Sequence, residues 1–214
     1  MPESGLSRRQ LHRQELRSEL LAAAHALVKE EGYEGLTIRR LAKRVGYAPM
    51  SVYSYFADKQ DILVALAEDV FGELARRAEK DAPADPLGAL RHGMRQFAGF
   101  GLENPNEYST IFMTAKPRPP ARSKAQEMEK KNPALQSMRR AVRACLEAGL
   151  LEGDEHAVTT LLWTTVHGAI SAMINFPSYP FGDRRRYADE AVELALAAVR
   201  ARRVAAFSGG DAPC

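Results

Sequence analysis

Hydroxyl, aromatic and basic side chains are concentrated between residues 36 and 59, in the order LTIRRLAKRVGYAPMSVYSYFADK. Hydroxyls and cationic groups bond phosphate oxygens, and apolar side chains in the major groove contact thymine methyls. Apolar residues at 38, 41, 42 and 45 recur at helical spacing, and Gly46 then ends that helix. Pro49 suits the first turn of a second helix. The pattern predicts a helix-turn-helix whose second helix lies against DNA.

The distribution of charge supports this interpretation. Residues 1–60 contain ten Lys and Arg against seven Asp and Glu, whereas residues 61–214 contain twenty of each. The whole formal net charge of +3 therefore lies in the segment with the motif, where a phosphate-facing surface needs it. The excess is small, however, and many solvated helices have as much.

The composition is that of a soluble helical protein. Hydrophobic residues make up 45%, charged residues 27% and aromatic residues only 7% of the 214-residue chain. The absence of an 18-residue apolar run and of a signal-peptide pattern predicts a cytoplasmic protein without a membrane span. Neither Cys145 nor Cys214 suggests a disulfide framework.

The sequence offers little for an enzyme. It contains no nucleotide-binding loop and no paired-carboxylate motif beside a base, and its five histidines form no metal-ligand pattern. We therefore expect no cofactor, no metal ion and no catalytic residue.

Helical periodicity predicts an all-α fold of about nine helices. We expect an N-terminal three-helix DNA-binding domain over residues 1–60, a helical effector-binding and dimerisation domain over 61–207, and a disordered tail over 208–214. The boundary falls within the helix predicted for 59–79, without a flexible linker. The remaining long helices are predicted at the following ranges: 11–31, 87–102, 106–115, 122–148, 155–176 and 184–204.

Residues 16–66 resemble the DNA-binding module of TetR-family transcriptional regulators. The resemblance rests on a helix that ends at Gly32, on LTIRRLAKRVGYAP, and on SVYSYFADKQDIL with its Tyr55-Phe56 pair and Lys59. It implies a helix-turn-helix that binds double-stranded DNA, and it gives roles to individual side chains.

The implied DNA contacts divide into phosphate and base contacts. Thr37, Tyr53, Tyr55 and Lys59 would bond phosphates, although Tyr55 could instead pack partly in the core. Pro49 and Met50 would contact thymine methyls, and Ser51 would bond a base or a phosphate. Arg39 would reach a base edge or remain a solvated charge. Two further polar residues of the motif complete the predicted set: Arg40 and Ser54.

Basic residues near position 10 extend this prediction. Arg8, Arg9, His12 and Arg13 lie ahead of and at the start of the first predicted helix, and they would form either an arm that contacts DNA or a disordered basic tail.

The C-terminal half resembles one subgroup of TetR-family domains through Trp163, His167 and Gly168, which read W-x-x-x-H-G. Trp163 and His167 are four apart and share a helix face. They would line an effector pocket, or else form a structural contact in the core or at a dimer interface. The family resemblance adds a largely apolar set that is equally compatible with plain core: Met94, Phe97, Tyr108 and Phe112.

The predicted function follows from these two halves. One module of this size reads few base pairs, so we expect a homodimer on a palindromic operator, with recognition helices about 34–36 Å apart. The interface would use the last two helices, whose alanine-rich faces permit close packing. A small, largely apolar effector would release this repressor. The alternatives are an activator, a dimeric DNA-binding protein without an effector and, least favoured, an enzyme.

Overall fold

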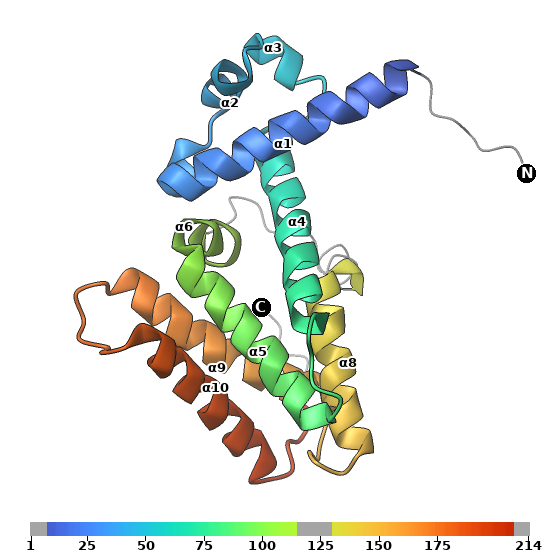
Figure 1. The fold of residues 1–214 in the computed structure, drawn as a ribbon, viewed down its shortest axis with the longest axis vertical. Coiled ribbons are helices and arrows are strands. Elements are labelled where there is room, and N and C mark those ends of the chain that lie inside the picture. Colours follow the sequence, from blue (N-terminus) through green and yellow to red (C-terminus); the bar gives the residue numbers. More distant parts are fainter. Residues whose placement is uncertain (1–7, 115–129, 208–214) are drawn as a thin grey trace, which may run out of the picture. The chain divides into compact units, whose positions relative to one another are not determined.

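The computed structural model describes residues 8–114 and 130–207. Within them it contains nine α-helices, one π-helical turn and no strand, which confirms the predicted all-α fold (Figure 1). The chain divides into two compact units. The N-terminal unit is Met1–Asp69 with Asn104–Ala115, and the C-terminal unit is Val70–Glu103 with Lys116–Cys214. The division between the units falls within α4 (Lys59–Glu79), and the return of residues 104–114 to the N-terminal unit was not predicted.

The first helix, α1 (Arg8–Gly35), begins three residues before the prediction and continues past Gly32. At Gly32 the backbone takes φ 69° and ψ −161°, so the helix is interrupted where the sequence predicts its end. The expected arm or tail of basic residues is thereby corrected, because Arg8, His12 and Arg13 all belong to this helix.

Two short helices follow in the predicted order. Thr37 caps α2 (Ile38–Val45) by accepting a hydrogen bond from the Arg40 N–H at 3.2 Å, and Gly46 ends the helix in the left-handed conformation at φ 75°. Pro49 begins α3 (Pro49–Val52), which is only four residues long and has no side-chain cap at Ala48. The next helix, α4 (Lys59–Glu79), extends into both units.

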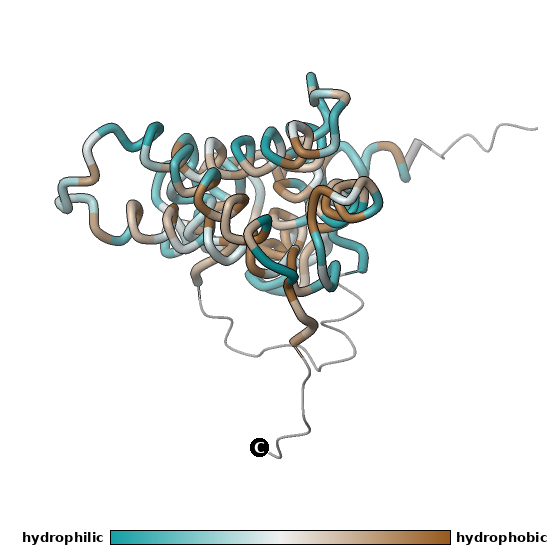
Figure 2. The backbone as a smooth tube through the Cα atoms, turned by 90° about the horizontal axis from the view of Figure 1, so that it is seen from below, coloured by the Kyte–Doolittle hydropathy of each residue, from teal (hydrophilic) through white to brown (hydrophobic). Residues whose placement is uncertain are grey.

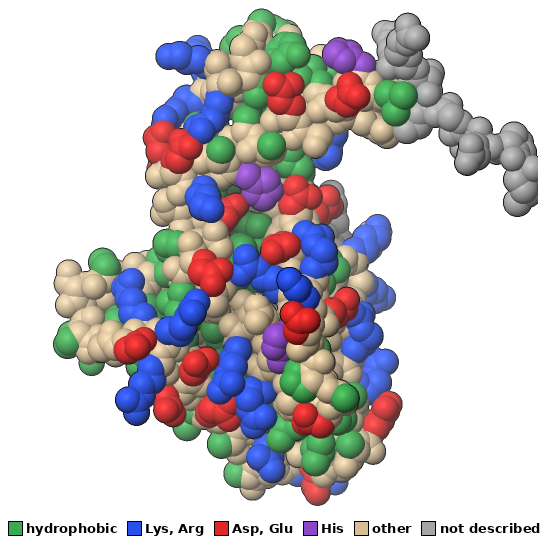
Figure 3. All heavy atoms as spheres, viewed as in Figure 1, with side chains coloured by type: hydrophobic (Ala, Val, Ile, Leu, Met, Phe, Trp, Pro, Cys, Tyr) green, Lys and Arg blue, Asp and Glu red, His purple; other side chains and the backbone are tan. Residues whose placement is uncertain are grey.

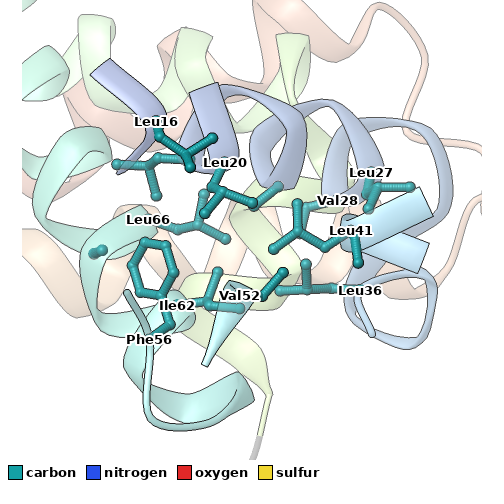
Figure 4. Close-up of a cluster of buried hydrophobic side chains, with 14 residues drawn as sticks. Leu16, Leu20, Leu27, Val28, Leu36, Leu41, Val52, Phe56, Ile62 and Leu66 are labelled. Carbon is teal, nitrogen blue, oxygen red and sulfur yellow. The ribbon is translucent and has the colours of Figure 1, made fainter. Parts of the chain in front are cut away.

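One apolar cluster joins these four helices. Leu20 of α1, Leu41 of α2, Val52 of α3 and Ile62 of α4 are all at most 1% exposed, and Figure 4 shows their side chains converging with that of Phe56. Burial of large apolar side chains is the main stabilising term in a unit of this size. The cluster therefore fixes α3 in place beside α2, on which it packs, and this sets the exposed surface of the motif.

The N-terminal unit is completed from further along the chain. α6 (Pro105–Tyr108) and the π-helical turn η1 (Ser109–Met113) pack on α1, where the sequence predicts a single helix over 106–115. The Asn106 amide donates a hydrogen bond to the Lys29 carbonyl at 2.9 Å, and the Tyr108 side chain is fully buried.

The C-terminal unit is a packed set of helices: α5 (Pro86–Glu103), α8 (Pro133–Glu147), α9 (Glu155–Asn175) and α10 (Arg184–Arg200). α10 packs on α5 and α9, and α8 packs on the same two helices. The chain after α10 returns to the start of α9, where Gly153 pairs with Val204. Hydrophobic and hydrophilic residues alternate along the helices in Figure 2, as the predicted amphipathic pattern requires.

Two sequence predictions fall partly or wholly outside the described residues. Only the C-terminal part of the predicted helix over 122–148 lies within the described residues, and the predicted tail over 208–214 lies outside them. Within the described residues one helix, α9, is long and apolar enough to cross a membrane; core helices of soluble proteins meet the same test, and α9 packs against three neighbours.

Candidate nucleic-acid interface

The recognition helix, α3, and the residue that follows it expose apolar side chains to solvent. The Met50 side chain is 75% exposed and that of Tyr53 is 50% exposed, whereas Val52 between them is fully buried. Pro49 and Ser54 are exposed, and Ser51 is half-buried. The predicted contact residues of α3 and of the two residues that follow it therefore lie on the surface, except that Ser51 is partly covered.

The preceding helix, α2, has four basic residues, and two of them form ion pairs with α1. Arg39 is exposed and forms no ion pair in the described part of the chain, so its guanidinium is available to a phosphate or base. Arg40 instead forms a bidentate ion pair with Glu31 of α1. Arg44 likewise pairs with Glu30 at 2.6 Å. Acidic residues at the end of α1 thus neutralise half of the basic face of α2.

Hydrogen bonds in these ion pairs raise the pKa of an arginine and lower the pKa of a glutamate. The hydrogen bond that Arg40 donates to Glu31 raises the pKa of Arg40, and the hydrogen bond that Glu30 accepts from Arg44 lowers the pKa of Glu30. All of these groups are exposed, so the pairs contribute little to stability. Their main effect is on charge, because a paired guanidinium is a weaker partner for phosphate.

Lys59 lies at the start of α4, as predicted, but its ammonium group has partners within the protein. Nζ donates a hydrogen bond to the Tyr33 carbonyl at 2.8 Å and lies 3.4 Å from the centroid of the Tyr33 ring. Partial burial lowers the pKa of Lys59. A phosphate contact by Lys59 remains a prediction, and it would have to share or replace this bond.

Tyr55 and Arg13 form a contact that the sequence did not reveal. Arg13 donates a hydrogen bond to the Ser54 carbonyl at 3.3 Å and lies 6.0 Å from the centroid of the half-buried Tyr55 ring. Tyr55 also packs against the apolar cluster, and its phosphate contact remains a prediction. Arg13 therefore stabilises the end of the recognition segment, and its partners lie 41 residues away or more.

The predicted pocket residues divide between the units. Met94 and Phe97 lie on α5, Met94 buried and Phe97 half-buried. Tyr108 and Phe112 belong to the N-terminal unit and contact one another with ring centroids 4.8 Å apart. The set remains a prediction.

Trp163 and His167 do meet, as their spacing predicts. Their rings stack on α9 with centroids 5.3 Å apart, and the Ser171 hydroxyl lies 3.3 Å from Nε2 of His167. Trp163 is 37% exposed, which fits a partner-facing surface as well as it fits a pocket wall. Burial lowers the pKa of His167, so its ring is mainly neutral at pH 7.

Comparison with known protein families shows which family the chain belongs to. Residues 20–66 match the family described as bacterial regulatory proteins, tetR family, and residues 87–199 match the tetracyclin repressor-like C-terminal domain. The chain belongs to the TetR family. This family comprises transcriptional regulators rather than enzymes. Within residues 8–114 and 130–207, no group of three or more His, Cys, Asp or Glu side chains could hold a metal ion.

Named relatives within the TetR family are similar over limited stretches. The HTH-type transcriptional repressor AcnR of Corynebacterium diphtheriae is 40% identical over 63 residues, which are 29% of this chain and 32% of that protein. The fatty acid metabolism regulator protein of Bacillus subtilis is 33% identical over 63 residues, again 29% and 32% of the two chains. The chain thus spans about a third of the length of these relatives.

Similarity to solved structures extends over most of the chain. The regulator FadR of B. subtilis, crystallised with stearoyl-CoA, has a TM-score of 0.69 and 19% identity, and the match covers 84% of this chain and 97% of FadR. At such identity the likeness concerns the fold alone.

The neutralising carboxylates of this TetR-family chain give a first prediction. Replacing Glu30 and Glu31 together by glutamine frees Arg40 and Arg44, so affinity for a random-sequence DNA duplex should rise at low salt. The slope of log affinity against log salt should steepen by about 0.9 for each arginine that gains a phosphate. Fluorescence anisotropy titrations across a salt series measure both quantities.

A charge-matched variant provides the control. Glu73 and Glu79 pair with arginines in the C-terminal half of α4 and beyond it. Replacing both by glutamine changes the net charge equally but should leave the salt slope unchanged. Equal effects of the two double variants would show that net charge alone governs binding and that the ion pairs on α2 do not.

Proposed function

We propose that this protein is a homodimeric, cytoplasmic repressor that binds a palindromic operator and is released by a small, largely apolar effector. The observation that supports it most is the exposure of Met50 and Tyr53 in the recognition segment, where Val52 is buried. The chain also belongs to a family of DNA-binding regulators. Repression is supported by the name of AcnR, a relative described as a repressor. Activation from another operator position is the second candidate.

The DNA contacts in this proposal combine position and sequence. Thr37, Tyr53 and Arg39 supply exposed hydroxyl and guanidinium groups for phosphates, and these fix the register of the module. Met50 and Pro49 supply apolar surface for thymine methyls in the major groove. The exposed side of α3 offers few polar groups for base edges, so the proposed readout favours thymine-containing steps.

The dimer in this proposal uses the uncovered sides of α9 and α10. Leu194 is 68% exposed and Tyr187 is 39% exposed, although both lie on a helix with a well-buried opposite face. On α9, a side-chain atom added at Gly168 would meet nothing within 4 Å, so a second helix can approach closely there. Two such helix pairs related by a two-fold axis would form a four-helix interface.

The effector in this proposal is chosen by chemistry. The side chains predicted to surround it are mostly aromatic or thioether groups, which favours an apolar molecule. FadR of B. subtilis, a protein of similar fold, was crystallised with stearoyl-CoA, and long-chain acyl-CoA is therefore the first probe to test.

Selection of bound duplexes from a random pool tests the proposal. We expect enrichment of an inverted repeat whose half-sites are centred about one helical turn apart, and release of the selected duplex by stearoyl-CoA at micromolar concentration. Enrichment without two-fold symmetry would contradict the dimeric operator. Binding of stearoyl-CoA without any change in DNA affinity would contradict release by this class of effector.

The selected duplex also permits a test of the apolar readout. Replacing each thymine of a half-site by deoxyuridine removes only the C5 methyl group. At the base beneath Met50 this should weaken binding by about 1 kcal/mol, the value of one buried methyl group. In a Met50→Ala variant the same replacement should have almost no effect, because the contact is already lost. Additive losses from the two changes would show that Met50 contacts something else.

A further inference from the structure

A histidine lies between two carboxylates in the N-terminal unit. Nδ1 of His25 on α1 is 2.8 Å from Oε1 of Glu107 on α6, and its Nε2 is 3.3 Å from Oδ2 of Asp69 on α4. Three helices thus meet through one ring. Nothing in the proposed DNA or effector site uses these residues.

The geometry determines the protonation state of the ring. A neutral imidazole has one N–H, so only one of its nitrogens can donate a hydrogen bond. Here both nitrogens of His25 face carboxylate oxygens, and both contacts are favourable only when the ring is an imidazolium. Glu107 is 9% exposed, and a carboxylate so covered is costly without a charged partner. The proton on His25 therefore holds the contact together.

The position of the three residues gives the contact its importance. Asp69 is the last residue of the first stretch of the N-terminal unit, and Glu107 lies in the stretch that returns to it. His25 thus joins α1 to both segments by which the chain leaves and re-enters this unit. The neighbouring Asn106 amide adds one neutral hydrogen bond, to the Lys29 carbonyl.

We propose that His25 is a positioning residue whose protonated ring holds residues 104–114 and the middle of α4 on α1, and that loss of the proton releases residues 104–114. The charged groups that face the ring are Glu107 from α6 and Asp69 from α4. On α1 itself, Lys29 lies one turn further along and is exposed to solvent. Tyr108 follows Glu107, and burial raises the pKa of its phenol, so it stays neutral.

The direction of the pH effect follows from the two carboxylates. The hydrogen bond that His25 donates to Glu107 raises the pKa of His25, burial opposes this rise in part, and Asp69 adds to it. A raised pKa in the folded state means that the contact stabilises fully below the ordinary histidine pKa of about 6.5 and is lost as the pH rises through the raised value. Residues 104–114 should therefore be most firmly held in mildly acidic solution.

Amide hydrogen exchange of the full chain between pH 6 and pH 9 measures the contact directly. After correction for the intrinsic pH dependence of exchange, peptides from residues 104–113 should lose protection by roughly tenfold or more as the pH rises, which corresponds to one hydrogen bond to a charged group. Peptides from α9 serve as an internal reference and should keep constant protection. A parallel NMR titration of the His25 ring should show the same midpoint.

Two variants separate the proton from simple packing. His25→Gln cannot become charged, so residues 104–113 should exchange rapidly at pH 6 and show no further pH dependence. His92→Gln is the matched control, because the His92 ring lies 3.3 Å from the Arg77 carbonyl in the C-terminal unit. It should keep the wild-type pH profile.

Several outcomes would overturn the proposal. One is protection of residues 104–113 that stays constant while the NMR signal of His25 titrates. Another is wild-type protection in His25→Gln at pH 6. If His25→Gln fails to fold, the wild-type pH series and Glu107→Gln decide, because Glu107→Gln should abolish the pH-dependent change. None of these measurements requires DNA, so they stand or fall separately from the proposed repressor function.

Discussion

Replacing Leu194 by glutamate is expected to convert the protein into a monomer and to weaken binding to its selected operator by roughly 100-fold or more. The leucine is 68% exposed on α10, and a carboxylate at this position would be buried without a partner in the proposed four-helix interface. A monomer must bind each half-site separately and loses the benefit of linked binding. Light scattering after size-exclusion chromatography gives the mass, and anisotropy titration gives the affinity.

A second exposed leucine supplies the control for this prediction. Leu150 is 38% exposed and lies in the segment between α8 and α9, outside both helices of the proposed interface. Leu150→Glu should remain dimeric with unchanged DNA affinity. If Leu194→Glu also remains dimeric, the proposed interface is wrong, whatever happens to DNA binding.

Replacing Phe56 by alanine is expected to destabilise the N-terminal unit by about 3–5 kcal/mol, the usual cost of truncating a buried phenylalanine. Phe56 is 1% exposed, it lies in the cluster of Figure 4, and the Arg17 guanidinium lies 5.1 Å from its ring centroid. A loss of this size is comparable with the whole stability of a small domain. DNA binding should be lost together with the fold of this unit.

The experiment can assign the loss to one unit. Trp163 is the only tryptophan, and it lies in the C-terminal unit. In urea, the Trp163 fluorescence transition of Phe56→Ala should match the wild type, whereas part of the far-UV circular dichroism signal should disappear at lower urea. A shift of both transitions together would show that the two units unfold as one.

Tyr53 provides a matched comparison three residues away. Its ring is 50% exposed, so Tyr53→Ala should change stability by no more than about 0.5 kcal/mol. If the ring bonds a phosphate as proposed, this variant should nevertheless weaken DNA binding. Folding and binding are thereby separated by two aromatic residues of the same short segment.

Much of the fold follows from local rules. The helical spacing of apolar residues predicts α5, α9 and α10 to within four residues at each end, and Gly46 and Pro49 mark the turn between α2 and α3. These features depend on backbone conformation and on the local separation of polar and apolar faces. A single sequence contains that information directly.

The missed features depend on pairs that are distant along the chain. Glu107 meets His25 across 82 residues, and Arg44 meets Glu30 across 14 residues. No periodic pattern relates such positions, and each charged residue looks like a solvated one until the helices pack. The same reason explains Lys59, whose partner Tyr33 lies 26 residues away.

The return of residues 104–114 to the N-terminal unit has a consequence for synthesis of the protein. When residues 1–69 have been synthesised, all residues of the apolar cluster are present. Asn106, Glu107 and Tyr108, which cover α1, are not yet present. The first unit to be translated is therefore completed only after α5, a helix of the second unit, has also emerged. An N-terminal fragment cut at residue 69 should expose the side of α1 that these residues cover, and it should aggregate more readily than one that is followed by a covalently linked copy of residues 104–114.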